Sequence, residues 1–525
     1  MKKLFVCAIT SVLLSSVARA QGPAADYADD AFRFSDFTQS GTARFRGLGG
    51  NQASLGGDAS NLFGNPAGLG FYNRSELSFS PSLNIANSQS TFLGAQTTGT
   101  RGRPGIGQFG AILAGKSDNG SRRWRRTAFG ITYSQSANFH DYIDARGRNL
   151  NPNSSIAQTY VNAANSEAYS ETALDEDYDP ATNQVSFREA AAYRLFLINP
   201  TDIPAQNFSG PPYTRFDVTT PKDQRATISR SGVHSQWSLA YAGNLDDKLY
   251  VGASVALTRL RYSSEFIFTE TPVGGRTFAN YGQTNRFDVS GSGFNVTIGL
   301  IYRINSQLQV GATVVSPSVS AVRETFNQRL SAVANNPALQ LRTNNVDVVT
   351  PFDNFEYSLQ TPLRASGGLT YFIGGGKTGF VTATAEYVGY GGTRVRTSYF
   401  DTQVDNTNFR NDVRQAVQST YQNVLNVRGG AEFRLGLFRL RGGVAYLPSA
   451  YKLDLDRVAR ADRAKLLISG GFGIRNERFF GDLSGSYLTT KSGFSPYQLT
   501  SDIDTPTVLT SNRNANLTLS VGVFF

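Results

Sequence analysis

The sequence predicts an all-β protein: a closed transmembrane antiparallel β-barrel of about 14 strands, with an N-terminal hatch that plugs the lumen. Three observations predict this fold. Apolar and polar residues alternate with a period of two in many separate runs along the chain. The connections between these runs are short and long in turn. A secretory leader precedes all of them.

The first 20 residues have the pattern of a signal peptide. Two lysines open it, residues 4–17 are apolar, and residues 18–20 fit the small-x-small cleavage site. The one cysteine of the chain, Cys7, lies within this segment. A mature chain without thiols can have no disulfide, no cysteine-ligated metal and no thiol nucleophile.

The composition excludes several classes of function. The 525-residue chain has a formal net charge of +10, but its Lys and Arg are scattered, so nucleic acid is not an expected partner. The two histidines, His140 and His234, are too few for a His-rich metal centre, and neither accompanies a nucleophile elbow or a triad. No calcium loop is present, and no long apolar stretch follows the leader. We therefore expect that the protein is not an enzyme, binds no metal or cofactor, and is not a helical membrane protein.

Strand candidates recur along the whole mature chain. One runs from Leu249 to Leu257 and another from Ala515 to Phe525, each with one apolar and one polar face. Strands are predicted to begin near residues 75, 105, 126, 232, 248, 285, 307, 361, 379, 424, 436, 464, 478 and 513. The total is about fourteen, and an even number is typical of bacterial outer-membrane barrels. Pro81 and Pro317 remove ladder donors, so bulges or strand ends are expected there.

The predicted connections alternate in length. Short ones lie at 244–247, 305–307, 374–377, 435–436 and 476–477, and long ones at 140–231, 264–284, 323–350, 398–423, 448–463 and 491–512. Periplasmic turns and extracellular loops produce this alternation, whereas a soluble sandwich has no reason to collect its long loops at one end. The terminal Phe525 also fits the assembly signal of such barrels. Closure is expected because an open sheet edge cannot lie in hydrocarbon.

Residues 21–74 lack the alternation and precede the barrel, which we assign to residues 75–525. About fifty residues are enough to plug a lumen of this size. The segment contains Ser40-Gly41-Thr42-Ala43-Arg44, Gly47-Leu48-Gly49-Gly50, Asp58-Ala59-Ser60 and Asn65-Pro66-Ala67-Gly68-Leu69. It closely resembles the N-terminal hatch of the FadL/TodX family of outer-membrane transporters for hydrophobic compounds, whose Asn-Pro-Ala motif is matched by Asn65, Pro66 and Ala67.

The resemblance spans essentially the whole mature chain. Stretches similar to the Bacteroidetes-type branch are Thr361-Pro362-Leu363-Arg364, Glu386-Tyr387-Val388 and Asn426-Val427-Arg428-Gly429-Gly430-Ala431-Glu432. The resemblance implies a 14-stranded barrel, a ligand path from surface loops to a lumen site, and a sideways exit through a gap beside a kinked strand. It also implies a monomer.

Candidate ligand-binding residues face the predicted lumen. The alternation puts eight charged residues there: Arg364, Glu386, Arg428, Glu432, Arg434, Arg439, Arg441 and Asp482. Arginine suits a carboxylate head group, and Arg428, Arg439 and Arg441 are the candidates. The alternative is that these charges pair with one another or tie down the hatch through Asp58. Within the hatch, Asn65 is expected to anchor the segment to the wall, and the tail with Phe32, Phe34 and Phe37 could reach the ligand.

The longest predicted loop, 140–231, contains helix-compatible runs near 154–174 and 186–198. A loop of this length without structure would be unusual, so folded helices are expected. A concentrated apolar patch in it consists of Tyr193, Leu195, Phe196, Leu197 and Ile198. Two interpretations remain open: a surface groove that captures a hydrophobic ligand, or a loop core packed on itself or on loop 398–423.

The resemblance implies a passive transporter in the Gram-negative outer membrane, which takes up long-chain fatty acids or other hydrophobic compounds. Its expected partners are these ligands, outer-membrane lipids and the barrel assembly machinery. The alternative is a FadL-like barrel that acts as a surface adaptor for protein secretion, as PorV-type components do. A transporter needs a gap in the wall and an apolar lumen pocket, whereas an adaptor needs neither. A nonspecific diffusion porin is disfavoured by the plug.

Overall fold

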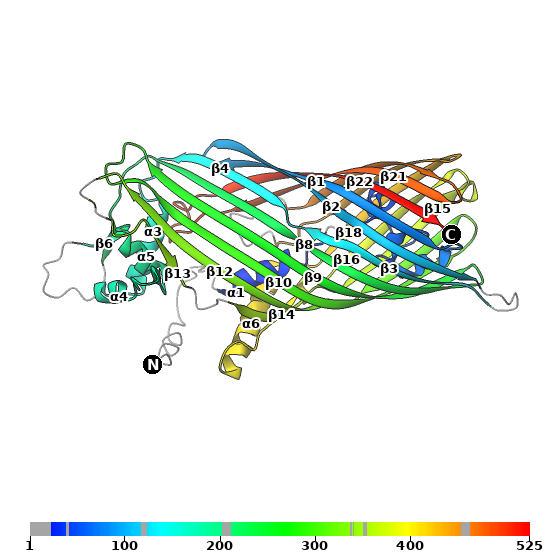
Figure 1. Ribbon diagram of the computed structural model, residues 1–525, viewed down its shortest axis with the longest axis horizontal. Helices are drawn as coiled ribbons and strands as arrows, with labels where there is room; N and C mark the ends of the chain where they lie inside the picture. Colours follow the sequence, from blue (N-terminus) through cyan, green and yellow to red (C-terminus); the bar gives the residue numbers. More distant parts are fainter. Residues whose placement is uncertain are drawn as a thin grey trace.

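The chain folds into one long β-barrel, with a group of short helices from residues 156–194 at one end and further helices within the barrel and at its side (Figure 1). This computed structural model describes residues 23–37, 41–116, 123–201, 212–336, 339, 341–349, 354–452 and 463–525. The predicted signal peptide, residues 1–20, lies outside the described residues. Among the described helices, none is both long and apolar enough to cross a membrane.

The sheet is closed because the first strand pairs with both the second and the last, and it contains the fourteen barrel strands that the sequence predicts. Ten are continuous: β1 (Glu76–Phe92), β2 (Ala95–Lys116), β8 (Lys222–Leu245), β9 (Leu249–Pro272), β10 (Phe278–Arg303), β18 (Val424–Leu435), β19 (Phe438–Leu447), β20 (Lys465–Arg475), β21 (Phe479–Phe494) and β22 (Val508–Phe524). Four consist of two pieces: β3 (Trp124–Asn138) with β4 (Asp141–Asn149), β11 (Leu308–Val315) with β12 (Val319–Ala334), β14 (Phe355–Gln360) with β15 (Arg364–Ile373), and β16 (Gly379–Val388) with β17 (Arg394–Arg396).

Proline accounts for two of the four interruptions. Pro317 separates β11 from β12, and Pro362 separates β14 from β15 on the neighbouring barrel strand. Pro81 does not end β1, but the register with β2 shifts between Ser80 and Pro81. Each proline lacks the N–H that a ladder needs, so the break expected at Pro317 and the bulge expected at Pro81 are confirmed.

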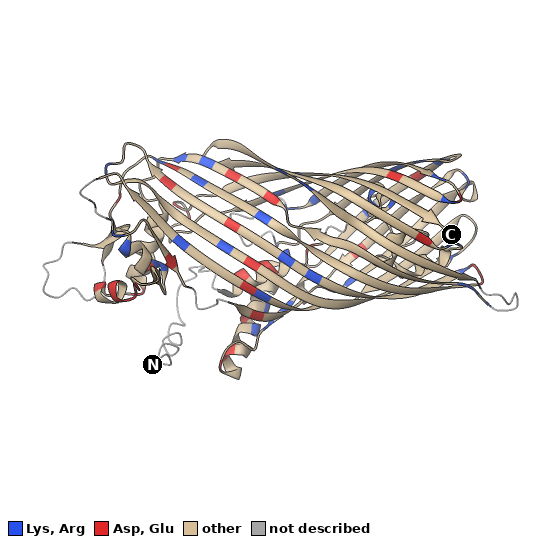
Figure 2. Cartoon of the chain, in the orientation of Figure 1, with Lys and Arg blue, Asp and Glu red and all other residues tan. Residues whose placement is uncertain are grey.

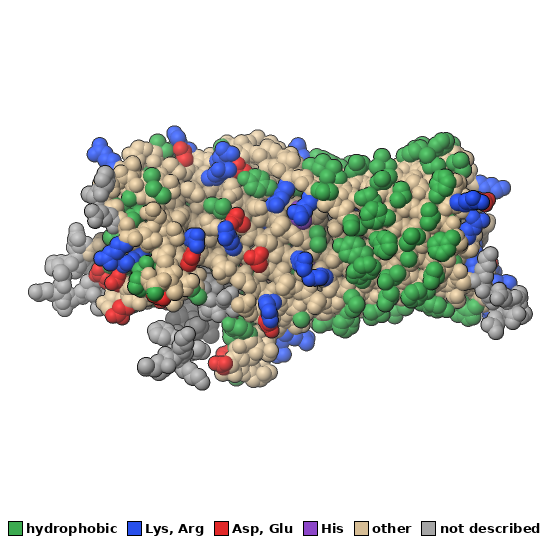
Figure 3. All heavy atoms as spheres, in the orientation of Figure 1, with side chains coloured by type: hydrophobic (Ala, Val, Ile, Leu, Met, Phe, Trp, Pro, Cys, Tyr) green, Lys and Arg blue, Asp and Glu red, His purple; other side chains and the backbone are tan. Residues whose placement is uncertain are grey.

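An apolar belt surrounds the half of the barrel that holds the C-terminus (Figure 3). Its outward-facing side chains include Leu77, Phe129, Leu257, Ile298 and Leu519, each more than a third exposed. The opposite half carries charged residues on its outer face instead (Figure 2). An apolar band bounded by polar surface is what a barrel presents to lipid.

The strands extend well beyond the belt, which corrects several predicted loops. Most of the predicted loops 264–284 and 323–350 belongs to β9, β10 and β12, and loop 140–231 begins with β4 and ends in β8. These strand ends face water on the outside and carry Ser, Thr, Arg and Glu there. The alternation of apolar and polar residues is therefore weak in these strand ends, and the sequence pattern there predicts a loop.

Short elements fill the far end and the gaps between strands. They are the helices α3 (Ile156–Ser166), α4 (Glu171–Glu176), α5 (Arg188–Arg194) and α6 (Gln403–Thr420), the 3-10 helices η3 (Gly374–Gly376) and η4 (Tyr390–Gly392), and the strands β5 (Gln184–Val185), β6 (Ile198–Pro200), β7 (Tyr213–Arg215) and β13 (Asn345–Val348). Helices α3 and α5 occupy the two runs in which the sequence predicts helix.

The N-terminal segment contains α1 (Pro23–Arg33), α2 (Ala43–Gly47), η1 (Ala59–Leu62) and η2 (Pro66–Phe71). From Gly41 to Tyr72 it bonds to inward-facing groups on strands spread around the barrel. The Ala43 N–H donates to Ser520 Oγ of β22 at 2.7 Å, and the Gly49 N–H donates to Ser469 Oγ of β20 at 3.1 Å. On the opposite side, the Ser54 and Thr370 hydroxyls are 2.8 Å apart. Contacts on so many strands require this segment to lie within the lumen.

A buried ion-pair network joins this segment to the wall. Arg44 Nε lies 3.4 Å from Glu432 Oε2, and the same oxygen accepts from Arg441 Nε at 2.8 Å. Arg441 in turn donates to Asp482 at 2.6 Å. The tie therefore runs through Arg44, not through Asp58 as the sequence suggested, because Asp58 accepts from Thr42 and from the Ser60 N–H within the segment. Removing one partner of such a buried network costs about 3–5 kcal/mol.

Small residues in the wall let the segment come close. A Cβ on Gly443 would lie 2.2 Å from the backbone nitrogen of Gly49, whereas a Cβ on the adjacent Gly442 would meet nothing within 4 Å. The wall at Gly443 is therefore shaped to the backbone of residues 48–49.

We expect Gly443→Leu to displace the N-terminal segment while the barrel remains closed, because the new side chain occupies the place of the Gly49 backbone. The measurement is maleimide labelling of a cysteine at Ser54, which is fully buried. Labelling should increase severalfold in Gly443→Leu and stay unchanged in Gly442→Leu. Equal labelling in the two variants would contradict this close fit, provided that both keep the heat-modifiable gel mobility of a folded barrel.

Candidate functional site

A cavity of about 480 Å³ lies in the lumen beyond the N-terminal segment. We call it the lumen cavity. Its wall comes from α1 and the residues after it, the junction of β3 and β4, parts of β8 and β9, and strands β15 to β22. It includes Phe32, Phe37, Phe139, His140, Tyr262, Arg364, Glu386, Tyr390, Tyr451 and Lys465. Aromatic rings alternate with charged groups around it, which suits a ligand with an apolar body and a polar end.

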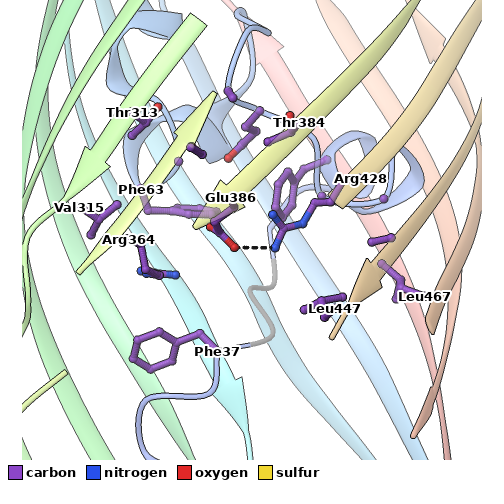
Figure 4. A pocket seen from close by; sticks show the side chains of 18 of the residues that line it. Phe37, Phe63, Thr313, Val315, Arg364, Thr384, Glu386, Arg428, Leu447 and Leu467 are labelled. Atoms are coloured by element: carbon purple, nitrogen blue, oxygen red, sulfur yellow. Dashed lines mark hydrogen bonds and ion pairs between the residues drawn. The ribbon is translucent and has the colours of Figure 1, made fainter. Parts of the chain in front are cut away.

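A smaller pocket of about 90 Å³ adjoins the lumen cavity and shares Phe37, Arg364 and Glu386 with it (Figure 4). Arg428 Nη2 donates to Glu386 Oε1 at 2.9 Å, the pair drawn as a dashed line. Val315, Leu447 and Leu467 supply apolar surface on the other sides. We call this the head-group pocket, because its charged groups converge on one small volume.

Arg364 is the cation in this pocket that has no carboxylate partner. Among the described residues it makes no ion pair, and its guanidinium lies 5.0 Å from the centre of the Phe37 ring. Glu386, the nearby carboxylate, bonds to Arg428 and to Asn426 instead. Arg364 is thus available to an anionic group that enters from the lumen cavity.

Several polar side chains around the pocket have unused hydrogen-bonding capacity. The amide of Gln52 and the hydroxyls of Thr313 and Thr384 are buried without a partner within the described structure. Buried polar groups are normally bonded, so this cluster marks a place where a ligand or water completes them.

Helix α1 closes the wall where the ladder is interrupted. β16 pairs with β18 up to Val388, but β17 pairs with β14 and not with β18 over the described residues. Phe32 fills this interruption: its ring stacks on Tyr421 at 4.6 Å and lies 5.1 Å from Tyr390. On the outer side, Tyr27 contacts Phe409 of α6 at 5.0 Å, and α6 projects from the side of the barrel (Figure 1).

A second interruption separates β2 from β3. These strands pair only from Gln108↔Ser134 to Lys116↔Arg126, while β2 continues beside β1 to Ala95 and β3 continues beside β8 to Asn138. A cleft of about 370 Å³ opens there, lined by Arg103, Pro104, Gly105, Gln135, Asn138, His140 and Arg261. We call it the lateral cleft.

The lateral cleft and the lumen cavity adjoin each other. Asn138 and His140 line the cleft, the lumen cavity and a third pocket of about 110 Å³. Leu467, Leu488 and Ile85 add apolar surface to that third pocket. The wall that separates the lumen from the lateral cleft is therefore thin here, beside the irregular register at Gln135.

The structure brings some predicted site residues together and separates others. Arg428 and Phe37 line the head-group pocket, whereas Phe34 packs against Tyr262 at 5.4 Å. Arg441 is committed to the buried network with Glu432 and Asp482. Arg439 donates to the carbonyl oxygens of Gly436 and Phe438 at the β18–β19 turn. Arg439 and Arg441 are therefore not placed to hold a ligand in this pocket.

The predicted capture patch is a packed core. Leu195, Leu197 and Ile198 are no more than 1% exposed, Tyr193 is partly buried, and Phe196 is the most exposed of the five at 36%. They pack with α3, the far ends of β9, β10 and β12, and residues near Val508. The prediction of an exposed capture groove is therefore wrong, and so is packing on loop 398–423, because the apolar cluster around α6 is separate.

The Asn-Pro-Ala motif anchors the N-terminal segment. Asn65 caps η2 by accepting from the Ala67 N–H at 3.1 Å. Its amide donates to the carbonyl oxygens of Ala53 at 2.6 Å and Leu300 at 3.3 Å. The side chain thus joins two parts of the segment to β10, as an anchor would, and it lines none of the pockets described above.

The sequence missed the residues of the lateral cleft. Gln135, Asn138 and Gly105 carry no motif, and they meet only because two strands diverge at a particular register.

Among the Asp, Glu, Cys and His side chains that the structure describes, no group of three or more could hold a metal ion.

The docking of α1 is expected to depend on pH. Burial raises the pKa of the Asp30 carboxyl from 3.8 to about 6, with Arg33 opposing and Asp29 adding to the shift. Docked α1 therefore binds a proton more tightly than released α1, so docking becomes tighter as pH falls through 6 and weaker above it. Hydrogen exchange of the α1 amides, corrected for intrinsic rates, should show this protection rise between pH 7.5 and 5. Burial also raises the pKa of Asp26 to about 6 and that of Glu324, which accepts from Tyr27 of α1, to about 7. Asp30→Asn should therefore make the profile shallower without abolishing it, and an unchanged profile would contradict the assignment.

Comparison with known proteins identifies the fold. No protein-family model matches this chain, and no curated relative does. A solved structure of a Pseudomonas aeruginosa FadL homologue aligns with a TM-score of 0.52 at 11% identity, over 93% of this chain and 99% of that one. The Pseudomonas putida toluene transporter TodX aligns with a TM-score of 0.50 at 13% identity, over 93% and 99%. This chain therefore has the closed 14-strand barrel fold of the FadL and TodX structures.

Proposed function

We propose that this protein is a passive transporter of hydrophobic compounds in the outer membrane, and that its ligands are long-chain fatty acids. The observation that carries the proposal is that the lumen cavity and the lateral cleft adjoin each other at Asn138 and His140, so that a small movement there would open a passage through the wall. An adaptor for secreted proteins, the alternative, needs no such passage. TodX of Pseudomonas putida is a toluene transporter, which is consistent with a hydrophobic ligand for this fold.

The head-group pocket favours an acid over a neutral hydrocarbon. Arg364 would bind the carboxylate, with the ring of Phe37 held over its guanidinium. Val315, Leu447 and Leu467 would contact the first methylenes. An alkyl chain gains about 0.8 kcal/mol for each buried CH₂, so a long chain can be held without covalent chemistry.

The remaining parts have matching roles in the proposal. Residues 21–74 act as a plug that closes the lumen to water, and the apolar belt contacts outer-membrane lipids. We propose that the barrel assembly machinery inserts the chain, that it works as a monomer, and that it catalyses no reaction.

Binding of a radiolabelled long-chain fatty acid to the purified, detergent-solubilised protein tests the ligand class. We expect saturable binding that Arg364→Gln weakens about 10-fold, because a charge-assisted hydrogen bond is lost. Arg439→Gln is the matched control, since Arg439 lies at a turn outside the pocket. Toluene should compete poorly. If neither ligand binds saturably, the transporter proposal fails and the adaptor becomes the better hypothesis.

Locking the lateral cleft tests the route. A Cβ on Gly105 would lie 3.6 Å from the amide nitrogen at the end of the Gln135 side chain, so the cysteines of Gly105→Cys and Gln135→Cys can be joined by a short, reducible thiol-specific cross-linker in the otherwise cysteine-free mature chain. We expect the cross-linked pair to stop uptake by whole cells while fatty-acid binding in detergent persists, and reductant to restore uptake. Full uptake by the cross-linked variant would exclude this exit.

A further inference from the structure

Most outward-facing arginines above the apolar belt are neutralised by carboxylates on adjacent strands. The pairs are Arg148–Asp223 at 2.7 Å, Arg225–Asp144 at 2.9 Å, Arg286–Glu265 at 2.8 Å, Arg329–Asp347 at 2.6 Å and Arg323–Glu356. They form cross-strand ladders on the charged half of the barrel (Figure 2). Such pairs cancel each other's field and leave little affinity for an external anion.

The arginines that line the lateral cleft differ. Arg103 of β2 and Arg261 of β9 line the same cleft from opposite sides, and neither has an ion pair or a side-chain hydrogen bond in the described part of the chain. Asp288, a neighbouring carboxylate on β10, makes no ion pair with Arg261. Two unpaired guanidinium groups therefore face one cavity of about 370 Å³.

Like charges that share a cavity repel, and a bound anion relieves the repulsion. A phosphate is the best match, because its oxygens accept two parallel hydrogen bonds from each guanidinium. The floor of the cleft adds Ser231, a hydroxyl donor, and Gly232, where the strand is irregular. Gly232 has a φ of +115°, and a Cβ there would lie 2.2 Å from the Arg261 carbonyl oxygen. This glycine keeps the strand in the shape that forms the cleft.

The cleft lies at the border of the apolar belt, where Figure 3 shows blue side chains next to green ones. On β9 the outward position four residues before Arg261 is Leu257, which is 63% exposed. Ile85 and Ile106 are exposed on the β1–β2 side, and Trp237 on β8. A ligand with a phosphate in the cleft would therefore have its apolar chains along these residues, which is the position of a lipid at the membrane surface.

We propose that the lateral cleft binds the phosphate of an outer-leaflet phosphorylated lipid between Arg103 and Arg261. This inference rests on the proposed outer-membrane location, but it does not depend on which molecule is transported. The lipid head group would cover the mouth of the cleft. A molecule leaving the lumen would then meet lipid directly and would not be exposed to water.

Native mass spectrometry of the purified protein in detergent tests the site, with diphosphorylated lipid A as the probe. We expect wild-type protein to retain it, and the double variant Arg103→Gln, Arg261→Gln to bind it at least about 10-fold more weakly, since two charge-assisted contacts are lost. The matched control is Arg286→Gln with Arg329→Gln, which removes the same charge from paired positions on the same outer face. It should bind as wild type does.

Two further probes separate the possible sources of the signal. Dephosphorylated lipid A should bind weakly to every variant, and inorganic phosphate should compete only at a large excess. Equal loss in both double variants would show a general charge effect and overturn the site. Equal retention of the dephosphorylated lipid, or equal affinity for inorganic phosphate, would also overturn the proposal. Fatty-acid binding by the same samples reports separately on the transporter proposal.

Discussion

Closure of the hydrogen-bonded ladder is the constraint on which the rest of this structure depends. In hydrocarbon every backbone N–H and C=O must be paired, and the β1–β22 pairing satisfies the last edge. Within the apolar belt the ladder is nearly continuous, with a bulge at Pro81. Among the described residues, pairing stops over longer stretches between β2 and β3 and between β17 and β18, towards the charged half. There water or charged head groups can satisfy the backbone, so the wall can be opened without the cost that lipid would impose. Both discontinuities adjoin the lumen cavity.

The two discontinuities are filled differently. Between β17 and β18 the interruption is filled by Phe32 of α1, whose ring packs against Tyr390, Tyr421 and Tyr451. Helix α6 covers the outer side. Between β2 and β3 nothing comparable covers the cleft within the described residues, and charged side chains border it. The first is thus closed by packing, whereas the second is an aqueous or lipid-facing mouth. This asymmetry is the reason to assign the exit to the lateral cleft.

The sequence predicted the features that repeat and missed those that depend on register. All fourteen barrel strands followed from the period-two alternation, because lipid on one side and a polar lumen on the other impose strong contrast on residues such as Leu249 to Leu257. The extensions of β9 and β12 past the belt were read as loops because both of their faces are polar. The patch at Leu195–Ile198 was ambiguous because an apolar run predicts that its side chains are buried but does not identify the residues that cover them. Arg428 could be placed in the lumen by alternation, but its partner Glu386, and the free state of Arg364, required the pairing of neighbouring strands.

Charged residues inside the barrel form two layers: one fixes the N-terminal segment to the wall, and the other has an excess of positive charge that could bind an anion. In the buried ion-pair network, Glu432 accepts from Arg44, Arg434 and Arg441. These ion pairs fix the N-terminal segment to β18 and β19. Nearer the lumen cavity lie three cationic side chains, Arg364, Arg428 and Lys465. Their carboxylate partners among the described residues are two, Glu386 for Arg428 and Asp36 for Lys465. The excess of positive charge lies where the segment ends and the cavity begins. An anion that enters this layer would therefore balance a positive charge that the protein leaves uncompensated, without disturbing the network that joins the N-terminal segment to the wall.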